Sequence, residues 1–542
     1  MLLNKLFAEI NNIYLSFFRY LREVYLNSSI YDKKISIVES KSLIYKPTLS
    51  ILSCLIKYDK KKQNIEDFDI ETIWNKRGAS NGNFVKLQNF FWLFSIDLKS
   101  SSKLTQSIIE KWIDRNQKYK NETWKIDILS KRVIAWISNS ILTYEDANRK
   151  YKNKIDNIIN KQINHLLLEI ERSNSVDDKL LGCTAIILSG ISYKNERFLN
   201  FGLKLLKKII SSSFDNSYFP RSRSIRQLVF YLKYFVLIRE LLKESLSNIP
   251  DYLDEIIFYL GKSFDLLSSS NQSLLFNGNH ISDQNDFKKY LSRHKYKFLN
   301  TQVESGGYAF LKDKNSMICM DIGPSPIKKF SDNYQSGTLS FEFFYKNEKI
   351  ICNSGYFQNY KKKLNVLSKS SAVHSTLILD NKSICSFNIA KNKKSLLEKG
   401  VKVFEKEIEN DKNIWAISSS HDGYVKNYGV IHCRKLNYDT KNLVLQGKDI
   451  LKKKNNFKKS NFNIRFHFMP NAKITKTYDN NTVLIELEHS GWKFNSSDGL
   501  IDIESGLFFG NKNRYQENLN INLSGITTEE EQIIKWELIK IS

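Results

Sequence analysis

The sequence predicts a helical domain followed by an antiparallel β domain, each with a hydrophobic core of its own. At 542 residues, the chain exceeds the roughly 250 to 300 residues at which single cores stop growing. The spacing of apolar residues changes near residue 295, from a helical period to alternation. Of the 21 glycines, seven precede residue 296 and fourteen follow it, as turn-rich sheets require. Helices followed by strands indicate two separate layers of structure.

Residues 1–295 are predicted to form helices that each bury one face. Apolar side chains recur there at three- and four-residue spacing in two clear stretches: Ile155, Ile158, Ile159, Ile163, Leu166, Leu167 and Ile170, and then Ile257, Leu260, Phe264 and Leu267. Blocks of about 40 to 50 residues, each long enough for a helix pair, fill this half of the chain. An (α/α) toroid, which is an incomplete helical barrel, and an α-solenoid both fit this pattern.

Residues 296–542 are predicted to form an antiparallel β domain whose strands have one wet face. Phe462, Ile464, Phe466 and Phe468 alternate with Asn463, Arg465 and His467, and Leu519, Ile521 and Leu523 alternate with asparagines. The polar stretch 280–298 is the predicted linker. His421, in the sequence SHDG, is predicted in a β-turn with the residues that follow it.

The charge of the chain favours anionic partners without selecting one class of them. The formal net charge is +26, from 83 Lys and Arg against 57 Asp and Glu. This charge is spread along the chain, and dense runs such as KKK at 361–363 and LKKKNNFKKS at 451–460 are typical of solvated loops. We therefore predict no nucleic-acid binding.

Cysteine usage and the N-terminal sequence give few constraints. The six cysteines are widely spaced, without a CxxC pair, and are predicted to be buried thiols. The first 26 residues are interrupted by Lys5, Glu9, Arg19 and Arg22, so they lack the apolar region of a signal peptide and instead predict an amphipathic helix. No run approaches the ~20 apolar residues of a membrane span, so no transmembrane segment is expected.

Seven sequence blocks follow one another from Gly306 onward: GGYAFLKDKNSMICMDIGP, SGTLSFEF, IICNSGYF, VHSTLILD, SHDGYVKNYGVIHCRKL, FNIRFHFMP and IDIESGLFFGNKNR. In this order they resemble the β-sandwich of the heparinase II/III-like polysaccharide lyases. Fainter likenesses to the toroid of that family lie at 90–94, 131–142, 178–190 and 215–230. The resemblance implies an N-terminal (α/α) toroid followed by a C-terminal antiparallel β-sandwich. It also implies cleavage of uronic-acid-containing polysaccharides by β-elimination.

The resemblance further implies which positions would carry the chemistry. β-Elimination needs a group that neutralises the substrate carboxylate, a base for the neighbouring proton and an acid for the leaving oxygen. The family typically supplies Asn or His, Tyr, and His for these tasks. Aligning the family's LSF with residues 339–341 places Asn333, Gln335 and Gly337 where it has His, His and Asp. An amide such as that of Gln335 cannot serve as a base near neutral pH.

The same comparison predicts that the structural zinc of some family members is lost, and no other cofactor is implied. Asn353 stands at a position where the family has an Asp ligand, and His374, in VHSTLILD, is the one ligand-type side chain that remains. A single His cannot hold an ion that needs three or four ligands. An isolated His at the start of an apolar strand is either a hydrogen-bonded core residue or, beside a cleft, a proton carrier.

In the helical half, the family positions also hold different side chains. The family's GNHL motif falls on 176–179, and its catalytic Tyr falls on Ile225 when DNSYFPRSRSIR is aligned with the toroid motif. The catalytic candidates are therefore His374, Tyr218, Asn333 and Gln335, and the substrate-binding candidates are Arg221, Arg223, Arg226, Tyr334 and Tyr356. Arginines can hold carboxylates or sulfates by bidentate contacts, but they can equally pair with acidic residues, and both tyrosines can equally be buried.

Three functions remain open at this point: a lyase of acidic polysaccharide with a rearranged catalytic set, a glycan-binding protein that keeps the fold without the chemistry, and an enzyme that remodels envelope polysaccharide. The resemblance implies work in the cell envelope or periplasm, whereas the absence of a visible signal peptide leaves the cytoplasm open.

Overall fold

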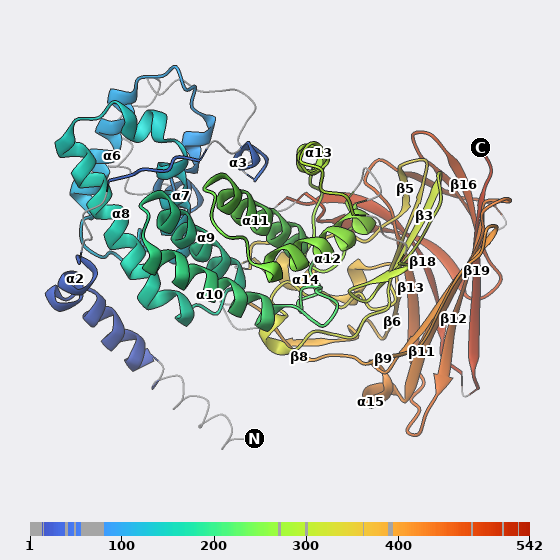
Figure 1. The fold of residues 1–542 in the computed structure, drawn as a ribbon. Coiled ribbons are helices and arrows are strands. Elements are labelled where there is room, and N and C mark those ends of the chain that lie inside the picture. The colour runs from blue at the N-terminus through green and yellow to red at the C-terminus, as the bar shows by residue number, and fades with distance from the viewer. Residues whose placement is uncertain are drawn as a thin grey trace. The chain divides into compact units, whose positions relative to one another are not determined.

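A computed structural model describes residues 14, 16–37, 42–47, 50–55, 81–268, 273–298, 302–360, 362–388, 394–478, 481–511, 514–528 and 530–542 (Figure 1). These residues form two compact units. The first comprises Met1–Ser212, Tyr231–Ile257 and Lys289–Arg293, and the second comprises Ser213–Phe230, Phe258–Lys288 and His294–Ser542. Within the described residues, helices dominate up to Arg293 and strands begin at Glu304. This order of helices and antiparallel sheets confirms the predicted fold class.

The helical region consists of amphipathic segments that begin at polar caps. The Ser101 and Ser175 side chains accept the backbone N–H groups of Leu104 and Asp178 at two helix starts. The described helices are α2 (Ser29–Ile35), α3 (Ile51–Leu55), α5 (Asn81–Gln88), α6 (Ser102–Asn116), α7 (Ile126–Ser138), α8 (Arg149–Glu169), α9 (Val176–Ser192), α10 (Glu196–Ser213), α11 (Ile225–Glu244), α12 (Asp251–Leu267) and α13 (Asn285–Arg293). The predicted helical stretches near 155–170 and 257–267 are confirmed as α8 and α12. The stretch predicted as a linker contains α13.

The core of the first unit is organised around a buried arginine. Arg132 on α7 is fully buried and lies 4.1 Å from the ring centroid of Trp112. Its guanidinium donates to the carbonyl oxygens of Gln88 and Thr123 and to the side chain of Gln162. No described helix is long and apolar enough to cross a membrane.

Among the described residues of the second unit, the strands form four antiparallel sheets. One has the order β1 (Glu304–Ser305), β2 (Tyr308–Lys312), β3 (Ser316–Asp321), β4 (Phe341–Tyr345), β5 (Glu348–Ile351). The largest has the order β14 (Lys473–Lys476), β15 (Thr482–Glu486), β16 (Gly491–Ser496), β19 (Gln532–Lys540), β12 (Val444–Lys453), β11 (Val430–Asp439), β10 (Ile414–His421), β9 (Val403–Asn410). A third has the order β17 (Leu500–Phe508), β18 (Gln516–Ile526), β13 (Asn461–His467), β6 (Leu377–Leu379), and β7 (Ser386–Asn388) pairs with β8 (Leu396–Lys399).

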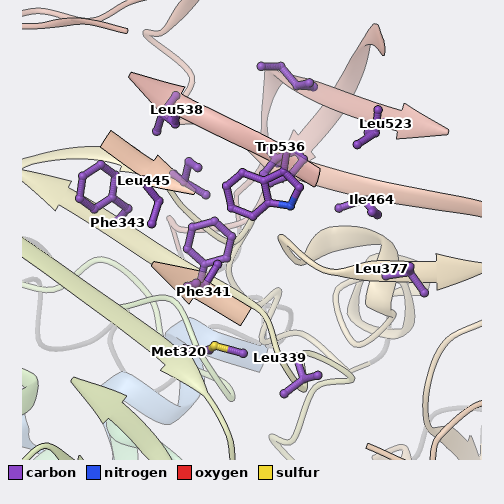
Figure 2. Packing of buried hydrophobic residues seen from close by; sticks show 14 of the residues in the cluster. Met320, Leu339, Phe341, Phe343, Leu377, Leu445, Ile464, Leu523, Trp536 and Leu538 are labelled. Carbon is purple, nitrogen blue, oxygen red and sulfur yellow. The ribbon is translucent and has the colours of Figure 1, made fainter. Parts of the chain in front are cut away.

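The three larger sheets share one hydrophobic core, as a β-sandwich requires. Figure 2 shows Phe341 of β4, Ile464 of β13 and Trp536 of β19 in this core. The Phe341 and Trp536 rings are stacked, with centroids 5.6 Å apart. The alternation of apolar and polar residues that predicted strands around 462–468 and 518–523 is confirmed, because β13 and β18 bury their apolar side chains in this cluster.

A charged network lies inside this core. The carboxylate of Asp449 on β12 accepts hydrogen bonds from Arg434 and from the indole N–H of Trp536, and it lies 2.7 Å from Nε2 of His432. His421 contacts His432 in turn, at 3.2 Å. The prediction of a β-turn at His421 is wrong, because this residue ends β10 with its ring fully buried. The network pairs each buried charge, as burial demands.

Candidate functional site

The loop that contains Tyr218 is a tight hairpin within the second unit. Phe214 and Pro220 form an isolated antiparallel bridge, and Oδ1 of Asp215 accepts the N–H groups of Ser217 and Phe219, both at 2.9 Å. Tyr218, between these anchors, has a φ of 58°, in the left-handed region. Non-glycine residues rarely adopt that conformation unless their surroundings hold them in it. The loop therefore presents Tyr218 in a fixed backbone geometry.

Tyr218 lies beside a large cavity of the second unit. Its ring stacks on the ring of Tyr259, with centroids 4.9 Å apart and planes at 10°. Tyr259 lines a cavity of about 990 Å³ together with Asp215, Asn216, Ser217, Pro220, Arg221, Arg223, Lys262, Ser263, Gln302, Glu304, Ser305, Gly306, Gly307, Pro324, Ser325, Pro326, Ile327 and Lys406. A volume of this size can hold a ligand of several rings. We call this space the hairpin cavity.

The charges of the hairpin cavity are mixed. Arg221 is exposed, and its Nε donates to the carbonyl oxygen of Phe214 at 2.7 Å, which anchors the guanidinium to the hairpin. Lys406 pairs with Glu304 across 3.0 Å at the cavity wall. Lys262 also lines the cavity, so Arg221, Lys262 and Lys406 are its positively charged groups besides Arg223.

Arg223 lies in the cavity wall, with its charge directed inward. The guanidinium donates to Asp321 at 2.7 Å and to the carbonyl oxygens of Gly306, Gly307 and Gly323. Burial alone would lower the pKa of Arg223, but Asp321 raises it above its ordinary value. Of the three arginines predicted to bind substrate, Arg223 therefore has a structural role, because it joins the hairpin to β3 and to the turns beside β3.

Arg226 acts electrostatically on Asp332 and on Tyr356, which is itself a predicted site residue. Burial raises the pKa of the Asp332 carboxyl, but Lys394 and other cations, including Arg226, bring it below its usual range. Burial raises the pKa of Tyr356 to about 12, against a smaller opposing effect of Arg226. The Tyr356 hydroxyl donates to the carbonyl oxygen of Asp332 at 3.3 Å and its ring is buried. Tyr356 therefore supports the segment around Asp332.

Gln335 joins three segments of the chain through its amide. Its Oε1 accepts the N–H of Gly278 at 3.0 Å, and its Nε2 donates to the carbonyl oxygens of Gly355, at 3.0 Å, and Ser368, at 2.5 Å. Gln335 is fully buried. An amide offers two N–H donors and a carbonyl acceptor, so both donors and the acceptor oxygen are engaged.

The neighbours of Gln335 are also packed against other segments. Asn333 is half-buried against Gly278, where an added Cβ would lie 2.6 Å from the Cβ of Asn333. Tyr334 is fully buried, and its hydroxyl accepts a hydrogen bond from Ser325, a residue of the hairpin cavity wall. Tyr334 therefore supports the cavity wall from inside the protein.

His374 is buried at the end of a short 3-10 turn. Its Nδ1 lies 2.9 Å from the carbonyl oxygen of Ser370, and its ring packs on Gly337, where an added Cβ would come within 2.5 Å of the His374 ring. Burial lowers the pKa of His374 to about 4. The imidazole is therefore neutral near pH 7, with no route for contact with a ligand at its exposed fraction of 1%.

Sequence reasoning missed three titratable residues in this region. Burial, and then His374, lower the pKa of His467 to about 3. Burial lowers the pKa of Lys369 to about 7, and its ammonium donates to the carbonyl oxygens of Asp332 and Ser395. His280 is half-buried, with Nδ1 3.0 Å from the amide nitrogen of Gln358. No sequence signal beyond the residue type singles out any of the three.

The family of the C-terminal half follows from a comparison with family models. Residues 300–537 match the model of the heparinase II/III-like C-terminal domain. This chain has a heparinase II/III-like C-terminal domain. The predicted resemblance to the heparinase II/III-like polysaccharide lyases is confirmed. No curated protein sequence matches the chain.

The fold of the whole chain is similar to that of solved heparinases. A structure of heparinase III is 12% identical, with a TM-score of 0.69, covering 94% of this chain and 88% of the other. The heparan sulfate lyase HepC from Pedobacter heparinus is 14% identical, with a TM-score of 0.63, covering 94% and 87%. At these identities, the likeness concerns the fold.

The heparinase-like domain holds a donor set that does not fit a structural zinc ion. Asn353 uses its Oδ1 to accept the N–H of Ser375 at 3.0 Å, and its Nδ2 cannot ligate a metal. Neither Asn353 Nδ2 nor His374 Nε2 has a hydrogen-bond partner among the described residues. Among the residues that the structure describes, no group of three or more His, Cys, Asp or Glu side chains is arranged to hold a metal ion. The loss of zinc stays a prediction.

Proposed function

We propose that this protein is a polysaccharide lyase that cleaves an acidic, uronic-acid-containing polysaccharide by β-elimination. The observation that carries the proposal is the fold, which is similar to heparinase III over 94% of the chain and includes the heparinase II/III-like C-terminal domain. The net charge of +26 supports an anionic substrate, since a cationic surface raises the local concentration of polyanions.

The hairpin cavity offers groups for two of the three tasks in the elimination. Arg221 is exposed and anchored, so its guanidinium can pair with the uronate carboxylate and stabilise the charge that develops beside it. Tyr218 belongs to the same hairpin and stacks on Tyr259, which lines the cavity, and its phenol would, as phenolate, take the proton from the carbon beside the carboxylate. The bond to the glycosidic oxygen then breaks, a double bond forms in the uronate, and the leaving oxygen takes up a proton.

The second candidate function is glycan binding without cleavage, either as a recognition protein or in the remodelling of envelope polysaccharide. The placement of Gln335 and His374 favours it. The amide of Gln335 uses both its donors and its acceptor oxygen in structural hydrogen bonds, and the imidazole of His374 is buried and neutral. The family positions that these residues occupy therefore supply no accessible acid or base.

The deciding experiment follows ultraviolet absorbance of the unsaturated uronate during incubation with heparan sulfate, chondroitin sulfate, alginate and polygalacturonate. We expect a rise with one of them that is lost in Tyr218→Phe and kept in Tyr259→Phe, which retains the stacked rings without the second hydroxyl. A flat trace combined with calorimetric binding that Arg221→Ala weakens would instead establish the binding function. A flat trace without binding to any acidic glycan would refute both.

A further inference from the structure

Three lysines lie in one row across the largest sheet. In the strand register, Lys435 on β11 is directly opposite Lys448 on β12, and Lys448 is directly opposite Lys535 on β19. All three side chains are exposed. They occupy the outer face, because the alternate residues Arg434, Asp449 and Trp536 point into the core. Adjacent strands are about 4.8 Å apart, so three ammonium groups are gathered over a span of roughly two strand spacings.

Such a row carries an electrostatic cost in the absence of an anion. Like charges directly opposite each other in a sheet are destabilising. Among the residues that the structure describes, no carboxylate forms an ion pair with the ammonium of Lys435, Lys448 or Lys535, although the Asp498 carboxylate accepts the backbone N–H of Lys535 at 2.9 Å. The exposed Lys473 of the same domain, by contrast, pairs with Glu486. The three ammonium groups of the row are therefore not neutralised by a described ion pair.

Beside the lysine row runs a second row of hydrogen-bonding side chains. Gln446, Glu537, Asn495 and Thr482 are directly opposite one another on β12, β19, β16 and β15. Thr482 donates to Asn495 at 3.1 Å, and the Asn495 amide donates to Glu537 at 3.2 Å. These bonds fix the side chains in a polar ladder of amide, carboxylate and hydroxyl groups.

Lys448 and Lys535 of the first row, and all four residues of the second, line a groove on the sheet. Its volume is about 550 Å³, and it is lined by Gln446, Gly447, Lys448, Asn481, Thr482, Lys493, Asn495, Ser496, Ser497, Lys535, Trp536 and Glu537. None of these residues lines the hairpin cavity. We propose that this outer sheet face is a second glycan-binding site, which holds an anionic oligosaccharide separately from the hairpin cavity.

The chemistry of the groove suits a charged sugar chain. Carboxylate or sulfate groups would pair with the lysine row, and sugar hydroxyls would donate to Glu537 and exchange hydrogen bonds with the amides of Gln446 and Asn495. A single-stranded nucleic acid fits less well, because its bases need exposed aromatic rings to stack on. The aromatic residue of the groove, Trp536, is only 2% exposed.

Lysine footprinting on the full-length protein tests the site directly. The protein is acetylated with an N-hydroxysuccinimide ester in low salt, with and without a heparin hexasaccharide, and modification is measured by mass spectrometry. We expect several-fold protection of Lys435, Lys448 and Lys535, and unchanged modification of the exposed Lys103 and Lys150 of the helical region. Equal modification of the three sheet lysines with and without glycan would overturn the proposal.

A charge-reversal pair gives an independent readout by calorimetry with the same hexasaccharide and with an oligogalacturonate. Lys448→Glu with Lys535→Glu is expected to weaken binding about tenfold or more, whereas Lys103→Glu with Lys150→Glu makes the same change in net charge and should leave it unaltered. A response to both oligosaccharides indicates carboxylate recognition, and a response to heparin alone indicates sulfate recognition.

Two further outcomes separate this site from the proposed lyase activity. Protection of the sheet lysines should persist in Arg221→Ala, whether or not any elimination is detected, because the hairpin cavity shares no lining residue with the groove. Loss of that protection in Arg221→Ala would refute a separate site. Stronger protection by an oligonucleotide than by heparin would replace the glycan assignment with nucleic-acid binding.

Discussion

Replacement of Asp449 by Asn should destabilise the β domain more than any single surface change. Asp449 is fully buried, and its carboxylate accepts from Arg434 at 2.8 and 3.1 Å and from Trp536 at 2.9 Å. The substitution keeps the volume and removes the negative charge, which leaves the guanidinium of Arg434 buried without a counterion. It also places an amide NH₂ group, which is itself a donor, against the N–H donors of Arg434 or Trp536, which then lose an acceptor oxygen.

The magnitude follows from the cost of a broken buried ion pair, about 3 to 5 kcal/mol. For domains of 150 to 250 residues, a change of 1 kcal/mol shifts the melting temperature by about 2 to 4 °C. The expected fall in Tm is therefore roughly 6 to 20 °C, with the lower part of this range favoured because the second unit is larger than those domains.

Differential scanning calorimetry of the full chain measures this shift, and hydrogen exchange of peptides from β11, β12 and β19 assigns the affected transition to the β domain. The matched control is Arg434→Met combined with Asp449→Leu, which removes both charges and should recover most of the lost stability, as apolar replacement of buried pairs does elsewhere. A fall below about 2 °C in Asp449→Asn would refute the reasoning that the pair is desolvated.

Three further predictions concern the same domain. Burial lowers the folded-state pKa of His374 to about 4 and that of His467 to about 3, whereas both are about 6.5 in the unfolded chain, so the unfolded chain binds more protons as the pH falls below 6.5. The stability that these neutral rings contribute is therefore complete above pH 6.5 and should decline as the pH falls toward 4. A urea midpoint that stays constant over that window would contradict burial of these rings. Gly337→Ala should lower stability by about 1 to 3 kcal/mol, because its Cβ would meet the His374 ring at 2.5 Å, and an unchanged melting temperature would show that the ring can move. Arg223→Lys should lower stability by about 3 kcal/mol or more, because an ammonium cannot replace the planar guanidinium that donates to Asp321 and to several carbonyl groups. An unaltered urea midpoint would show that those acceptors are satisfied without the guanidinium.

The sequence contains enough information to predict the fold class, because periodicity is local. The helical spacing near Ile155 and the alternation near Phe462 report a buried face without reference to any other segment, and both elements form as α8 and β13. The family blocks add the order of the strands. The segments 213–230 and 258–288 could not be assigned in this way, since their inclusion in the second unit depends on long-range contacts.

The candidate site was less predictable for the same physical reason. Arg223 and its partner Asp321 are 98 residues apart, so the sequence shows a cluster of arginines and not the ion pair that neutralises one of them. The lysine row is likewise invisible before the register of β11, β12 and β19 is known. At His421, the turn-like sequence is real, but pairing with His432 draws the ring into the core.

The resemblance implies a histidine in the family at position 335, and placing one there tests whether Gln335 has a structural role in this chain. Gln335 accepts from Gly278 and donates to both Gly355 and Ser368, segments that are 57, 20 and 33 residues away. A neutral imidazole has one N–H donor and one acceptor, so Gln335→His must leave at least one buried partner unsatisfied, at about 1 to 3 kcal/mol. We expect a lower melting temperature and no gain in elimination, while Gln335→Glu, which has no donor when ionised, should be worse still. A gain of lyase activity in Gln335→His with unchanged stability would mean that the imidazole reaches substrate, and that the amide's three hydrogen bonds are not what holds this residue in place.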